Sequence, residues 1–179
     1  FNDAQRDVLG LFLERDQDLG DRLEGQFGLR LNRVTTDADE VDGTPAMMMP
    51  PAQALRDAFN AADRGQEDTT LDLVLKLNYR LSDSTLLYAG AAQKQRAPSY
   101  QERYLWLPLE ATAGLADGQL YIGDINLDPE RLRSIELGAD VSGGRFSLQP
   151  RLFYTHIDDY IQGTPLDAAH PATRMVRMM

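Results

Sequence analysis

Apolar and polar residues alternate along several stretches of the chain, and each such stretch predicts a β-strand with one apolar face. The clearest runs from Leu71 to Leu81, where every odd-numbered residue is Leu or Tyr and most even-numbered residues are polar. From Thr85 to Arg96 the alternation is weak, because Ala and Gly give too little contrast to assign an apolar face. Altogether the pattern predicts about six strands, over residues 8–16, 23–32, 71–81, 85–96, 133–141 and 146–154.

The connections between these predicted strands alternate between short turns and long loops. Short turns are predicted at Asp18–Asp21, Ser82–Ser84 and Ser142–Gly144, whereas 35–70 and 97–130 are long. Between Pro51 and Gly65 the first long connection has apolar residues at helical spacing, which predicts a short helix: Ala52, Leu55, Ala58, Phe59 and Ala62. Short turns at one end and long loops at the other are typical of bacterial outer-membrane barrels.

Alternation alone leaves two all-β interpretations open, a membrane barrel and a soluble binding module. In both, one face of each strand is apolar and the other is polar. No stretch approaches the roughly 20 consecutive apolar residues of a membrane-spanning helix. A barrel strand needs only about 10 alternating residues, which is compatible with the negative mean hydropathy of this chain.

Charge and cysteine content exclude some functions. The chain has 179 residues and a formal net charge of −10, which argues against nucleic acid as a partner because phosphates require a basic surface. It contains no Cys, so it has no disulfide framework, thiolate metal site or cysteine nucleophile. Because it begins at Phe1 without a signal segment and stops at Met179 where the pattern resumes, we expect a fragment.

Several motifs follow one another in a fixed order in the second half of the chain. Arg96-Ala97-Pro98-Ser99 ends one predicted strand, Leu127-Asp128-Pro129-Glu130 precedes the next, and Glu136-Leu137-Gly138 lies within it. Phe153-Tyr154 is then followed by Asp158-Asp159-Tyr160-Ile161. Together these motifs resemble the C-terminal half of TonB-dependent outer-membrane receptors, over roughly residues 71–164.

The resemblance implies an antiparallel, up-and-down transmembrane β-barrel of about 22 strands in the bacterial outer membrane, of which residues 1–179 form a part. The plug domain, the TonB box and the remaining strands are expected to lie outside this chain. The implied function is uptake of a scarce nutrient, such as a siderophore-iron or other metal chelate. The implied partners are outer-membrane lipid, the small-molecule nutrient and, through the plug, the TonB energy-transducing complex. Neither a resident cofactor nor enzymatic activity is expected.

Two sets of residues are candidates for contact with cargo. The second long loop and its start carry an aromatic and cationic set suited to planar or anionic ligands, namely Arg96, Tyr100, Arg103, Tyr104 and Trp106. The first long loop carries Met47, Met48 and Met49, whose thioethers are soft ligands that select Cu(I). A copper-specific receptor is therefore an alternative, and a passive porin-like channel is another.

Other polar groups do not form a recognisable catalytic or metal motif. The acidic run from Asp37 to Gly43 lacks the spacing of a calcium loop and is better explained by solvated charges. His156 and His170 have no hydrolase or metal-site spacing around them. Asp158 and Asp159 are adjacent in the sequence, and neighbours on a strand point to opposite faces, so they are not expected to act together on one substrate atom.

Overall fold

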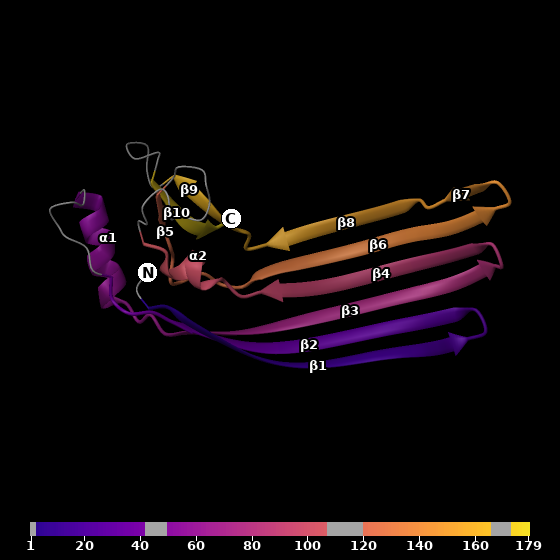
Figure 1. The fold of residues 1–179 in the computed structure, drawn as a ribbon, viewed down its shortest axis with the longest axis horizontal. Coiled ribbons are helices and arrows are strands. Elements are labelled where there is room, and N and C mark those ends of the chain that lie inside the picture. The colour runs from indigo at the N-terminus through magenta and orange to yellow at the C-terminus, as the bar shows by residue number, and fades with distance from the viewer. Residues whose placement is uncertain (1–2, 42–49, 107–119, 166–172) are drawn as a thin grey trace.

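The computed structural model describes residues 3–41, 50–106, 120–165 and 173–179. One large antiparallel sheet runs through most of the molecule, with the order β1-β2-β3-β4-β6 and with both β7 and β8 paired to β6 (Figure 1). Its strands are β1 (Gln5–Gly20), β2 (Leu23–Asp37), β3 (Gln66–Ser82), β4 (Thr85–Arg96), β6 (Glu130–Gly143), β7 (Phe146–Leu148) and β8 (Arg151–Asp158). The order in space follows the order in sequence, which confirms the predicted up-and-down arrangement.

The remaining elements gather at one end of the large sheet. The helices are α1 (Pro50–Ala61) and α2 (Tyr100–Tyr104), and a small sheet of order β5-β10-β9 consists of β5 (Leu120–Ile122), β9 (Ile161–Pro165) and β10 (Thr173–Met178). Figure 1 shows them beyond the ends of the strands, with the tight turns of the large sheet at the opposite end. By the asymmetry of outer-membrane barrels, the crowded end is the outer one.

Strand register places the apolar positions of all strands on the same face. Leu29 pairs with Leu13 on one side and with Leu73 on the other, and Ala89 pairs with both Leu77 and Leu137. Residues directly opposite each other point to the same side of a sheet, so this face is continuous. It also assigns the apolar face of β4, which the sequence left open, to Leu87, Ala89 and Ala91.

The apolar face of the large sheet is exposed, and so is its polar face. Leu11, Leu75 and Leu137 are 74%, 47% and 53% exposed, whereas the buried hydrophobic residues of the described chain lie near the outer end. An apolar surface of this extent suits lipid, with the polar face directed toward a lumen. The second sheet does not cover either face, so the described residues form no sandwich core. None of the described helices is long and apolar enough to span a bilayer.

Several element boundaries differ from the sequence predictions. β1, β2 and β3 extend beyond the predicted strands because backbone ladders continue through polar residues, so the first turn is only Asp21–Arg22 and the predicted 35–70 loop shortens to 38–65. The predicted sixth strand is divided into β7 and β8, since Pro150 has no N–H to donate. The predicted helix is confirmed as α1, whereas α2, β5, β9 and β10 were not predicted.

On the lumen face, an aromatic ring lies across a glycine of the neighbouring strand. Tyr88 of β4 is paired with Gly138 of β6, its hydroxyl is 3.1 Å from Glu136 Oε1, and the Arg151 guanidinium lies 4.5 Å from its ring centroid. This cluster borders a groove of about 500 Å³. A Cβ atom added at Gly138 would overlap the outer end of the Tyr88 ring, so the ring would have to move.

We expect Gly138→Ala to displace the Tyr88 ring and to destabilise the barrel by about 1–3 kcal/mol, because the added methyl group overpacks the site. Thermal unfolding of the full-length receptor in detergent would measure the change. Gly20→Ala is the control, since a Cβ there meets no atom within 4 Å. Equal unfolding temperatures for the two variants would contradict the prediction.

Candidate functional site

The helix α2 starts directly after β4 because the sequence supplies a complete N-terminal cap. Ser99 Oγ accepts a hydrogen bond from the Glu102 backbone N–H at 3.2 Å, and a Glu102 carboxylate oxygen accepts one from the Ser99 N–H at 2.7 Å. This reciprocal arrangement is a capping box. The spacing Ser99-x-x-Glu102, directly after the Pro98 that ends the strand, is the signal in the sequence that predicts a helix at α2.

Arg96 connects α2 to the large sheet. Its two terminal nitrogens donate to both carboxylate oxygens of Glu102, at 2.7 and 2.9 Å, and its Nε donates to Glu130 at 2.7 Å. Burial opposes the charged form of Glu102, but the hydrogen bonds from Arg96 and Ser99 outweigh it and lower the Glu102 pKa below its usual value. Glu130 also accepts from the Ile161 N–H, so this network joins β4, α2, β6 and β9.

Arg103 is a fully buried cation whose terminal nitrogens have partners. It donates two hydrogen bonds to the Asp68 carboxylate, at 2.8 and 3.0 Å, and others to Thr36 Oγ1 at 3.1 Å and the Leu127 carbonyl at 2.7 Å. Only 1% of Arg103 is exposed. The guanidinium therefore holds β2, β3, α2 and the segment before β6 together at one point.

Tyr104 continues this buried network. Its hydroxyl lies 2.7 Å from the Arg64 carbonyl, which can only accept, and 2.9 Å from Thr36 Oγ1. Because Tyr104 has one hydroxyl proton, it donates to Arg64 while Thr36 donates to it. Burial raises the pKa of Tyr104, so its hydroxyl keeps this proton.

The other two predicted aromatic residues lie nearer the surface. Tyr100 on α2 is 39% exposed. Trp106 is half-buried, and its ring centroid lies 5.9 Å from that of Phe59 in α1. The structure thus brings the five predicted residues into one region, with Arg103 and Tyr104 beneath the surface and Tyr100 and Trp106 closer to it. Cargo contact stays a prediction for all five, and Met47, Met48 and Met49 lie outside the described residues.

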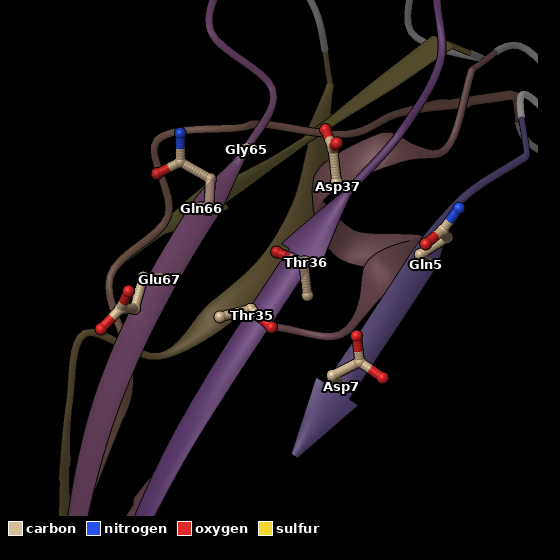
Figure 2. Close-up of a pocket in the computed structure, with 8 residues that line it drawn as sticks. All are labelled: Gln5, Asp7, Thr35, Thr36, Asp37, Gly65, Gln66 and Glu67. Carbon is tan, nitrogen blue, oxygen red and sulfur yellow. The ribbon is translucent and has the colours of Figure 1, made fainter. Parts of the chain in front are cut away.

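A polar cleft of about 340 Å³ opens between the outer ends of β1, β2 and β3. Figure 2 shows its lining, which includes the carboxylates of Asp7, Asp37 and Glu67. Glu67 is paired with Arg33 at 2.7 Å, and Asp37 accepts the Ala38 N–H at 2.8 Å. Within the described ranges, no three His, Cys, Asp or Glu side chains are grouped to hold a metal ion. Thr36, which contacts Arg103 and Tyr104, also lines the cleft.

Comparison with solved structures finds the same fold in several transporters and receptors. The copper transporter OprC superposes with a TM-score of 0.68 at 20% identity, over 98% of this chain and 24% of that one. The hemophore receptor HasR of Serratia marcescens superposes with a TM-score of 0.65 at 18% identity, over 97% of this chain and 29% of that one. The iron transporter FrpB of Neisseria meningitidis superposes with a TM-score of 0.60 at 17% identity, over 97% of this chain and 21% of that one. The chain thus spans about a quarter of the length of these proteins. No curated protein sequence matches it.

At the sequence level, residues 1–174 match the family described as "TonB dependent receptor-like, beta-barrel". This match covers nearly the whole chain and includes the first half, where the motifs had given only a strand pattern. It agrees with the open antiparallel sheet, its continuous apolar face and its polar lumen face. The protein belongs to the TonB-dependent receptor family, and its large sheet is part of an outer-membrane β-barrel.

Proposed function

We propose that this chain is part of the barrel wall and outer surface of a transporter that takes up a scarce nutrient, such as a siderophore-iron or other metal chelate. The supporting observation is the folded region at the outer end of the sheet, where the Arg103 network supports the aromatic residues Tyr100 and Trp106. Large aromatic side chains on a rigid base lose little entropy on binding a ligand. The proteins with this fold include ones named for copper, iron and heme.

The proposal extends to the rest of the receptor. The plug domain and the remaining strands belong to the same longer protein, and energy reaches the plug from the TonB complex. Catalysis has no part in this function. Growth on a panel of ferric siderophores, haem and copper, with and without the gene for the full-length receptor, would identify the cargo. Uptake that survives deletion of TonB would overturn the proposal in favour of a passive channel.

We expect Trp106→Ala and Tyr100→Ala to weaken binding of the cargo identified in that panel by about tenfold or more, as loss of an aromatic anchor does at other interfaces. Isothermal titration with the purified full-length receptor would measure the affinity. Tyr79→Ala is the matched control, because Tyr79 is 41% exposed, close to the 39% of Tyr100, but lies on the apolar face of the sheet. Unchanged affinity in both outer variants would remove these residues from the site.

A copper-specific receptor is the second candidate, and the three adjacent thioethers at Met47, Met48 and Met49 are the observation that favours it. If it is correct, replacing all three by Leu will lower Cu(I) affinity by at least about tenfold while volume and apolarity are kept. Met179→Leu is the control, since that exposed residue lies outside the loop. Equal Cu(I) affinity in the triple variant and the control would dispose of the copper alternative.

A further inference from the structure

The two long outer segments, 38–65 and 97–129, share one small hydrophobic core. Its buried members come from both segments, and they are Ala38, Val41, Phe59, Tyr104 and Ile125. Trp106 and Ala4 pack against this cluster. Segments with a common core cannot open independently without exposing apolar surface, so their movements are coupled.

Phe59 is the contact through which α1 joins this core. Among the described side chains of α1 it is the only buried one, at 7% exposure. Its ring lies edge-on to Tyr104 at 6.5 Å and 84°, and tilted against Trp106 at 5.9 Å and 42°. Both partner rings belong to the other segment, so Phe59 is placed between the buried network and the more exposed indole.

Polar contacts attach the backbone around Phe59 to the same region. The Asn60 side chain accepts from the Val41 N–H at 2.9 Å and donates to the Val41 carbonyl at 3.1 Å. Arg64 donates to the carbonyls of Ala38 and Asn60, and its own carbonyl accepts from Tyr104. These bonds fix where α1 ends and thereby the position of the Phe59 ring.

The backbone of Trp106 pairs with Ile122, and its ring packs against Phe59. It forms an isolated antiparallel bridge with Ile122, and the Gly123 N–H donates to the Leu105 carbonyl at 2.7 Å. Its indole Nε1 is buried and has no hydrogen-bond acceptor among the described residues. Because its N–H makes no bond there that would set the ring, the orientation of the indole depends on packing, and among the described residues Phe59 supplies the aromatic part of that packing.

We propose that Phe59 is a positioning residue that fixes the Trp106 indole and joins the two outer segments into one unit. The effect of this coupling on uptake rests on the proposed cargo contact of Trp106. Cargo that touches the indole then also acts on α1, although α1 belongs to the other segment. The coupling itself exists in the receptor without cargo, so it can be tested separately.

Hydrogen exchange on the cargo-free, full-length receptor tests the coupling. Phe59→Ala is expected to speed amide exchange about tenfold or more in the peptides around Trp106 and Ile125, which lie in the other segment. Phe59→Leu keeps most of the buried apolar volume and is expected to stay within about threefold of wild type. The control Phe27→Ala, on the exposed apolar face of the sheet, should leave these peptides unchanged. A change of less than about threefold in Phe59→Ala would overturn the proposal.

Fluorine NMR of the receptor labelled with 5-fluorotryptophan tests the positioning, with Trp106→Phe used to assign the signal. Both Phe59→Ala and Phe59→Leu are expected to move the Trp106 signal, because both remove the neighbouring ring, whereas Phe59→Tyr should restore it. An unmoved signal in both variants would refute the positioning role. Neither measurement contains cargo, so its outcome is independent of whether Trp106→Ala affects transport.

Discussion

Arg103→Ala is expected to lower the free energy of local opening at the outer end of the sheet by about 3–5 kcal/mol, because it leaves the Asp68 carboxylate buried and unpaired. The variant also removes the donors to Thr36 and to the Leu127 carbonyl. Native-state hydrogen exchange of the full-length receptor would measure the opening of β2, β3 and α2. Faster exchange should be confined to this end, since the rest of the sheet keeps its ladders.

Arg33→Ala is the control for this effect, because Arg33 of β2 and Glu67 of β3 form another ion pair. Their side chains are 61% and 50% exposed, so solvent screens the pair and its loss should cost less than about 1 kcal/mol. In the double variant Arg103→Met with Asp68→Leu, both charges are replaced and part of the stability should return. Equal losses in Arg103→Ala and Arg33→Ala would show that the buried pair has no special role.

Gly123→Ala is expected to separate the segment before β6 from α2. A Cβ at Gly123 would overlap the Arg103 backbone and lie 2.8 Å from the Glu102 carbonyl oxygen, and backbone cannot move aside as a flexible side chain can. We expect a loss of about 1–3 kcal/mol or more in local stability, and hydrogen exchange at Gly123 and Asp124 would report it. These amides donate to the Leu105 and Glu102 carbonyls in the wild type.

Gly144→Ala controls for the change of residue type, since Gly144 lies in a turn where a Cβ meets nothing within 4 Å. If Gly123→Ala and Gly144→Ala leave exchange at Asp124 equally slow, the close approach of the two segments does not limit stability. If only Gly123→Ala speeds it, the packing of this segment on α2 is confirmed as the cause.

Both predictions concern the same physical arrangement, a folded outer region above an open sheet wall. In the described chain the buried side chains and the one buried ion pair, between Arg103 and Asp68, lie at this end. Lipid and lumen contents cover the wall in a complete barrel, whereas the outer loops must supply their own core. If Trp106 contacts cargo as proposed, a rigid base of this kind means that its side chain need not be ordered at the moment of binding.

Residue type and spacing predict strands more reliably than they predict the role of a single side chain. Cations and aromatic rings in a loop favour ligand contact by Arg96, Arg103 and Tyr104, yet all three make bonds that hold the outer region together. The residue types are the same for a ligand site and for a buried polar network. What distinguishes the two is burial and the presence of partners, and Arg103 meets Asp68 although they are 35 positions apart in the sequence.

Strand order, the apolar faces of most strands and the end that carries the long loops follow from the sequence alone. These features are local, because each strand has its own two-residue period of apolar positions and every second connection between consecutive strands is a short turn. Tertiary structure decided the apolar face of β4, the pairing of β5 with β10 and the contacts of Thr36 with Tyr104 and of Phe59 with Trp106. Such contacts join residues far apart in the chain, and no spacing rule specifies them, since they form only when the strands bring the two long segments to the same end.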